Sequence, residues 1–162
     1  MNRLQVASAC KQYGPALLHL PPGLDGVQVL WALAGNESSF GVDCAPRHES
    51  AFDQGGVYGN GPVMQPLLAQ WGSAAACSYG PWQLMFCNAP ANYAPSDMAD
   101  LDKAAAATLA FLNRLLVRWH PATLAEVGEC WNAGHPLSTL SAGVARYVHD
   151  LAANYNVPLP CA

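Results

Sequence analysis

Apolar residues recur at the spacing of a buried helix face in segment 24–36. Four of them follow the order i, i+3, i+4 and i+7, namely Val27, Leu30, Trp31 and Ala34. The segment therefore predicts a helix with one buried face. Gly35 near its end favours termination there, which places Glu37 at or just past the last helical turn.

The clearest helical pattern covers 101–119, where acidic residues lie in the first turn and Arg118 and Pro121 mark the end. Arg114 and Arg118, at i and i+4, are predicted to lie on its solvated face. Further helices are predicted at 63–71, 123–131 and 143–154, with a short one near the N-terminus before a Pro-Pro-Gly break.

Segment 40–96 is interrupted by many glycines and prolines, so outside the helix at 63–71 it is predicted to be loop with short turns. A loop region of this length within one domain usually carries function. The chain has 162 residues, which indicates a single domain, 1–162, with its core in 24–155. The fold class expected from these patterns is mainly α.

Composition narrows the classes of function. Charged residues make up only 11% of the chain and the net charge is −4, so a nucleic-acid binder is not expected. No run of apolar residues is long enough for a membrane helix, so no membrane insertion is expected either. The scattered histidines form no His-x3-His pair, so we expect no zinc site and no other cofactor. We also expect the chain to be a monomer.

Six cysteines are present, an even number that fits one to three disulfides. The alternative is buried free thiols, since cysteine is among the most often buried residues. The six are Cys10, Cys44, Cys77, Cys87, Cys130 and Cys161.

Four short motifs follow one another along the chain. The first helix ends in Glu37-Ser38, and a Ser-x-Gly segment with a nearby glutamine follows at 78–83. An aromatic-Asn-Ala-Gly turn occupies 131–134, and a last helix carries Tyr147-Val148. In this order the motifs resemble the lysozyme superfamily, in the branch of soluble lytic transglycosylases and goose-type lysozymes. Two positions depart from the family pattern: Pro-Trp stands at 81–82, where Leu-Met is usual, and Trp131 replaces a tyrosine.

The resemblance implies a lysozyme-like helical domain in which the loop-rich insertion 40–96 forms one wall of a substrate cleft. It implies cleavage of peptidoglycan glycan strands at the β-1,4 bond between N-acetylmuramic acid and N-acetylglucosamine, with Glu37 as general acid. The place of action would be the periplasm or cell wall. The segment at the start of the chain does not read as a signal peptide, so we expect export through a phage lysis or secretion apparatus, or earlier removal of a signal.

The chemistry of glycosidic cleavage independently requires a carboxylic acid that keeps its proton near neutral pH. An exposed glutamate, with a pKa of about 4.3, would be ionised. Trp31 and Phe40 flank Glu37, so a desolvated carboxyl group is expected there.

A second carboxylate would decide the reaction type. Asp43, Glu49 and Asp53 all follow Glu37 in the loop, and Glu49 ranks first because Arg and His stand beside it. Segment 46–53, PRHESAFD, is also similar to a segment of some phage-type N-acetylmuramidases. If no second carboxylate faces Glu37, the transglycosylase route is expected, in which the muramic acid's own C6 hydroxyl attacks and leaves an anhydro product.

The remaining candidate residues each have two interpretations. Ser78 and Gln83 would line the cleft or orient the Glu37 carboxyl, and Trp82 would stack on a sugar or lie in the core. Asn132 would bind an N-acetyl group or end a helix with Gly134. Tyr147 and Trp131 complete the expected substrate-binding set, with the Tyr147 hydroxyl placed near Glu37 by the family resemblance; its alternative is a place on a buried helix stripe.

Two other functions stay open at this point. One is a Cys/His amidase or peptidase acting on the peptide stems, with Cys77 or Cys130 as nucleophile and His120, His135 or His149 as base. The other is a non-catalytic glycan-binding domain of the same fold.

Overall fold

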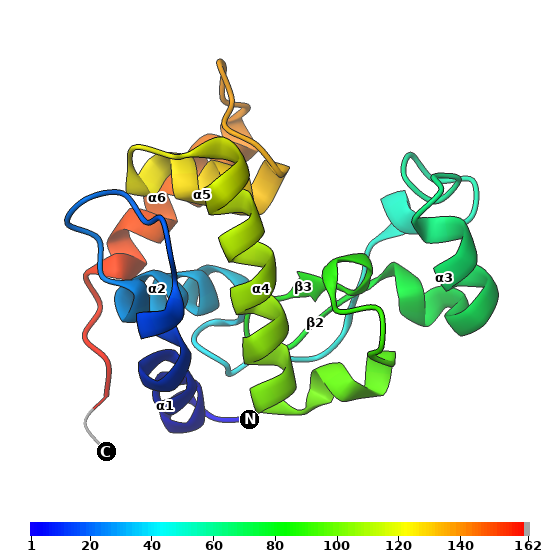
Figure 1. Ribbon diagram of the computed structural model, residues 1–162, viewed down its shortest axis with the longest axis horizontal. Helices are drawn as coiled ribbons and strands as arrows, with labels where there is room; N and C mark the ends of the chain where they lie inside the picture. Colours follow the sequence, from blue (N-terminus) through cyan, green and yellow to red (C-terminus); the bar gives the residue numbers. More distant parts are fainter. Residues whose placement is uncertain (161–162) are drawn as a thin grey trace.

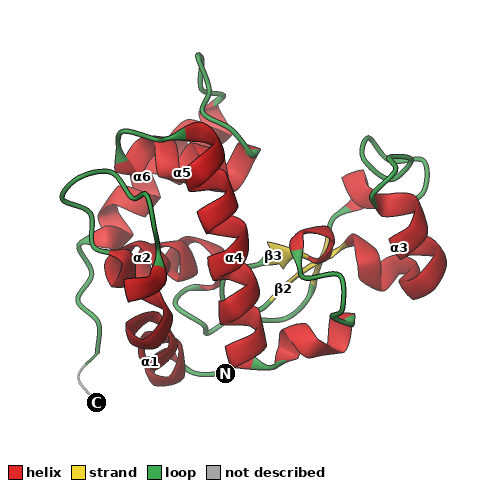
Figure 2. Ribbon diagram, viewed as in Figure 1, coloured by secondary structure: helices red, strands yellow, loops and turns green. Residues whose placement is uncertain are grey.

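Helices dominate the secondary structure of residues 1–160, the part of the chain that the computed structural model describes. Within these residues there are six α-helices (Figures 1 and 2). Their bounds are α1 Arg3–Tyr13, α2 Gly26–Ser38, α3 Met64–Trp71, α4 Leu101–Trp119, α5 Leu124–Ala133 and α6 Ala142–Tyr155. The prediction of a mainly α fold is therefore confirmed.

The main core lies among five of these helices. Helix α2 packs against α1 and α6, while α5 contacts both α4 and α6. Residues 29–34 of α2 are all fully buried, so the middle of this helix is enclosed on every side and not on one face as the sequence pattern predicted. Figure 1 shows α3 and its flanking loops apart from the other helices, with β2 and β3 lying between them. The chain thus forms a helical part and a loop-rich part that face each other across a small sheet.

The sheet has three short antiparallel strands in the order β1-β2-β3. They are β1 (Arg47–His48), β2 (Cys77–Tyr79) and β3 (Leu84–Met85), with Arg47 opposite Ser78 and Ser78 opposite Met85. The sequence analysis predicted loop here, because strands of two or three residues are too short to show an alternating pattern. A second apolar cluster, including Met64, Phe86 and Met98, joins this region to α4.

Helix boundaries agree with the sequence pattern to within a few residues, and α4 covers the predicted 101–119. The expectation that Gly35 ends α2 is wrong, since the helix continues to Ser38. Gly35 instead allows close packing: a Cβ there would lie 2.7 Å from the Phe40 ring and 2.8 Å from Asn154 Cγ. Within residues 1–160 no helix combines the length and the apolar character that crossing a membrane requires.

Five of the six cysteines lie within residues 1–160, and all five are free thiols. Cys10 and Cys130 are buried, as the alternative interpretation expected. Disulfides among these five are therefore not formed in this structure. Cys161, the sixth cysteine, lies outside the described residues.

Candidate functional site

A cleft of about 960 Å³ lies between the loop-rich part and the helical part. One wall comes from the loop region and the small sheet, and the other from α4 and the end of α5, while Glu37 from the end of α2 also faces it. The polar and charged side chains in its lining are Glu37, Arg47, Glu49, Ser78, Gln83, Asn88, Arg118, Asn132 and His135.

The Glu37 side chain lines the cleft and is only 13% exposed. Its Oε1 accepts two hydrogen bonds, from the Tyr147 hydroxyl at 2.7 Å and from Trp131 Nε1 at 3.0 Å. Its Oε2 lies 4.0 Å from Nη1 of Arg47. Arg47 also donates to the Glu37 main-chain carbonyl at 3.0 Å. The two carboxyl oxygens therefore have different surroundings, one held by donors and one near the guanidinium.

Burial raises the pKa of Glu37 above its ordinary value, because desolvation disfavours the charged form. The hydrogen bonds from Tyr147 and Trp131 and the charge of Arg47 oppose this shift, and the negative charge of Glu49 adds to it. The raised pKa extends the pH range in which the carboxyl keeps its proton. This is the direction that a general acid requires.

The end of α2 is held by its neighbour Ser38, which is buried. The Ser38 hydroxyl lies 2.7 Å from the carbonyl of Pro81 and 3.0 Å from that of Ala34, and it accepts from the Gly41 main-chain N–H at 2.9 Å. The chain then leaves the helix in the left-handed region, with φ of 51° at Ser39. Ser38 therefore fixes the position of Glu37 relative to the β2–β3 turn.

Substitution of Ser38 by Ala should lower the free energy of unfolding by about 1–3 kcal/mol, because it leaves buried polar groups without a partner. Urea denaturation measures the change, and Ser138→Ala, at an exposed position, is the matched control. A stability equal to that of the Ser138 variant would show that the Ser38 hydrogen bonds do not hold the helix end.

Glu49 is a second carboxylate in the same cleft. Its Oε1 accepts from the Ser78 hydroxyl at 3.3 Å, and the Ser78 hydroxyl also lies 3.0 Å from Gln83 Oε1. The side chains of Ser78 and Gln83 are both buried. Of the three acids proposed from sequence, only Glu49 lines the cleft with Glu37, because Asp53 pairs with His48 at 2.8 Å and Asp43 is exposed elsewhere.

Gln83 holds the wall of the cleft together. Its amide Nε2 donates to the carbonyls of Gly80 at 2.9 Å and Ala45 at 3.3 Å, which ties the β2–β3 turn to the loop before β1. It adopts φ of 44°, a strained value for a residue with a side chain. Ser78 and Gln83 both line the cleft, but the hydrogen bonds of both side chains go to groups other than the Glu37 carboxyl.

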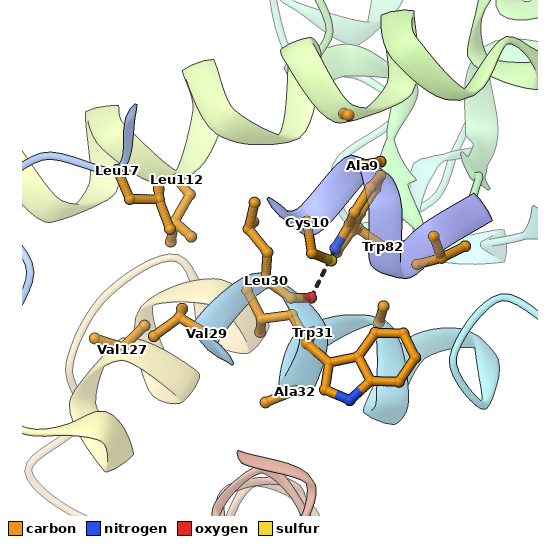
Figure 3. Packing of buried hydrophobic residues seen from close by; sticks show 14 of the residues in the cluster. Ala9, Cys10, Leu17, Val29, Leu30, Trp31, Ala32, Trp82, Leu112 and Val127 are labelled. Atoms are coloured by element: carbon orange, nitrogen blue, oxygen red, sulfur yellow. Dashed lines mark hydrogen bonds between the residues drawn. The ribbon is translucent and has the colours of Figure 1, made fainter. Parts of the chain in front are cut away.

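The assignment of Trp82 to substrate binding is wrong. Its side chain is fully buried, and its Nε1 donates to the Leu30 carbonyl at 2.9 Å. Figure 3 shows the indole inside the main core, near Ala9 and Cys10 of α1. Trp82 therefore joins the β2–β3 turn to α2, because its indole satisfies its one polar group inside the core.

The last two motifs divide between holding the acid and lining the cleft. Tyr147 binds Glu37 directly but does not line the cleft, so it acts on the carboxyl rather than on a ligand. Trp131 does both, since its indole lines the cleft and donates to Glu37. Asn132 lines the cleft in the last turn of α5 with an exposed side chain, and Gly134 caps that helix.

Sequence reasoning missed the direct contact of Arg47 with Glu37, although it placed an arginine beside Glu49. In the sequence Arg47 is only a charged residue in a loop. Its spacing of ten residues from Glu37 did not indicate that the chain folds back to bring the two side chains together. The register of β1 against β2 explains it, because pairing Arg47 with Ser78 brings this loop to the cleft.

The cysteine-based alternative finds no supporting geometry in residues 1–160. Cys130 is buried and its pKa is raised to about 11, mainly by desolvation, which opposes thiolate formation. The Cys77 thiol lies 3.4 Å from the Ser73 carbonyl, and no described hydrogen bond joins a cysteine to a histidine. Within the same residues no three His, Cys, Asp or Glu side chains gather as metal ligands.

Comparison with protein-family models, curated proteins and solved structures gave no match for the chain. The arrangement around Glu37 is therefore the basis for a proposal of function.

Proposed function

We propose that this chain cleaves peptidoglycan glycan strands at the β-1,4 bond between N-acetylmuramic acid and N-acetylglucosamine. The observation that carries the proposal is the Glu37 carboxyl group, largely enclosed at the side of the cleft, with its pKa raised mainly by desolvation. An acid of this kind can protonate a glycosidic oxygen. The order of the four sequence motifs supports the choice of peptidoglycan as substrate.

The hydrogen bonds around Glu37 indicate which oxygen carries the proton. The indole N–H of Trp131 can only donate, and it points to Oε1, which also accepts from Tyr147. In the neutral acid Oε1 is therefore the carbonyl oxygen and Oε2 bears the hydrogen. The proton passes from Oε2 to the glycosidic oxygen, the bond from that oxygen to C1 of the muramic acid breaks, and Glu37 is left as a carboxylate.

The second carboxylate in the cleft supports hydrolysis over the anhydro route. In this proposal Glu49 accepts a proton from water as the water oxygen attacks C1, which gives a reducing N-acetylmuramic acid end. The Ser78 hydroxyl lies 3.3 Å from Glu49 Oε1 and 3.0 Å from Gln83 Oε1, so its single hydrogen is shared between these two acceptors. The C1–O glycosidic bond breaks and a bond from C1 to the water oxygen forms. Glu37 has then lost one proton and Glu49 has gained one.

Digestion of purified sacculi tests the proposal. We expect soluble muropeptides with reducing ends, identified by mass spectrometry. Products lighter by one water would assign the chain to the transglycosylase route, in which the muramic acid C6 hydroxyl attacks. Sacculi that bind the protein but release no muropeptides would contradict cleavage and favour a glycan-binding domain.

Tyr147→Phe should move the high-pH limb of the pH–rate profile to higher pH. The hydrogen bond from the Tyr147 hydroxyl lowers the pKa of Glu37, so its removal lets the acid keep its proton further into the basic range. Tyr155→Phe is the matched control, because its hydroxyl accepts from Asp25 at the other end of α2. If the high-pH limb of Tyr147→Phe stays where it is in the wild type, or moves to lower pH, Glu37 is not the acid whose deprotonation produces that limb.

A further inference from the structure

Two arginines of α4 lie in or next to the cleft that contains Glu37. Arg118 is part of the cleft lining. Arg114, one turn earlier, donates from Nη2 to the Asn88 carbonyl at 3.1 Å, and Asn88 belongs to the opposite wall. Arg114 therefore bridges the two walls, and Arg118 extends the same basic stripe.

Neither arginine is neutralised by an acid of the described residues. Arg47, Lys103 and Arg146 form salt bridges with Glu or Asp, whereas Arg114 and Arg118, like Arg3 and Lys11, form none within residues 1–160. The chain as a whole carries an excess of four negative charges. Two guanidinium groups without an acidic partner, at a cleft in an acidic protein, indicate an anionic group on the ligand.

Two aromatic rings, Trp131 and Phe111, connect the acid to Arg114. Trp131 donates to Glu37, the Phe111 ring centroid lies 5.6 Å from that of Trp131, and the Arg114 guanidinium carbon lies 5.4 Å from the Phe111 centroid. Trp131 and Phe111 both line the cleft. A ligand whose bond lies at Glu37 can therefore extend along this wall to the arginines.

The groups around Arg118 suit a peptide better than a bare anion. Arg118 stacks 4.9 Å from the Trp119 centroid, and Trp119 lies 5.9 Å from the His135 ring. His135 Nδ1 lies 2.8 Å from the Pro136 carbonyl, which can only accept, so neutral His135 carries its hydrogen there. Its Nε2 is then an acceptor. The site thus offers guanidinium donors for a carboxylate and an imidazole acceptor for an amide N–H.

We propose that this arginine end of the cleft, Arg114, Arg118 and His135, binds a carboxylate of the peptide stem carried by N-acetylmuramic acid. The inference rests on the proposed function and names the part of the substrate that gives the cleft its preference. Stem-bearing strands should accordingly be cleaved with a lower KM than strands from which the stems have been removed.

The test compares the double variant Arg114→Gln/Arg118→Gln with the wild type on intact sacculi and on sacculi stripped of stems by an amidase. We expect kcat/KM on stem-bearing strands to fall about tenfold more than on stem-free strands, with the larger change in KM. Arg146→Gln is the charge-matched control, since Arg146 is exposed on α6 and pairs with Asp150. Arg118→Gln alone, which leaves the Arg114–Asn88 bridge intact, should show the same direction.

Equal losses on both substrates, or no loss on either, would overturn the peptide-stem site. Recovery of the preference by Arg118→Lys but not Arg118→Gln would support a charge contact. Failure of the proposed function would look different, because the wild type would then cleave neither substrate.

Discussion

Glu37→Gln is expected to lower the rate of muropeptide release by at least about 10²-fold, the usual contribution of a general acid. Glutamine keeps the shape of the side chain, and its carbonyl can still accept from Tyr147 and Trp131, but it has no proton to give to the leaving oxygen. Release is measured on purified sacculi by chromatography. Asp43→Asn, an exposed acid of the following loop, is the matched control and should stay within the error of the wild type.

The same variant should be more stable than the wild type at neutral pH. The folded-state pKa of Glu37 lies above its unfolded value, so the wild type loses stability as pH rises from the unfolded pKa through the folded one. Glutamine does not titrate, so the pH-dependent part of the difference should shrink as pH falls and disappear well below the unfolded pKa of about 4.3, where Glu37 is protonated in both states. Thermal unfolding across this range measures it. If Glu37→Gln is as active as the wild type, or less stable than it at neutral pH, Glu37 is not the buried acid proposed here.

Glu49→Gln is the second substitution with a large expected effect. Loss of the base should lower hydrolysis by about 10²-fold or more, although the Ser78 hydroxyl can still donate to a glutamine carbonyl. It should also lower the pKa of Glu37, because the negative charge of Glu49 raises it. Rate and product mass are measured together on sacculi.

Asp53→Asn is the control for this variant, since Asp53 lies in the same loop but pairs with His48. If Glu49→Gln keeps its rate and the product is the anhydro form, Glu49 is not the base and attack by the C6 hydroxyl replaces that of water. Either outcome leaves the role of Glu37 as acid intact.

Helix α4 was the most predictable, because it carries a periodic apolar face and clear signals at both ends. Asp100 caps its start by accepting from Lys103 N at 3.0 Å. The prediction that α2 ends at Gly35 was wrong because a glycine can occur either at a helix end or where another group packs closely against the backbone. The second use applies here, where Phe40 and Asn154 leave no room for a Cβ.

The candidate site was predictable only in part. Glu37 stood out through its motif and the flanking aromatic residues, and Glu49 through its basic neighbours. The burial of Trp82 could not be foreseen, because a tryptophan beside a glycine-rich turn is equally compatible with a sugar platform and with a core. The strands could not be predicted from the sequence, because segments of two or three residues that pair with distant parts of the chain show no local pattern.

The charge state of one side chain can be observed directly by following its carboxyl carbon in a ¹³C NMR titration, with the signal assigned by its loss in Glu37→Gln. If Glu37 is the acid, its midpoint lies above that of an ordinary glutamate and moves higher in Tyr147→Phe and lower in Glu49→Gln. A midpoint at or below the ordinary value would contradict this role, because the Glu37 carboxyl would then be ionised at neutral pH and would have no proton to donate.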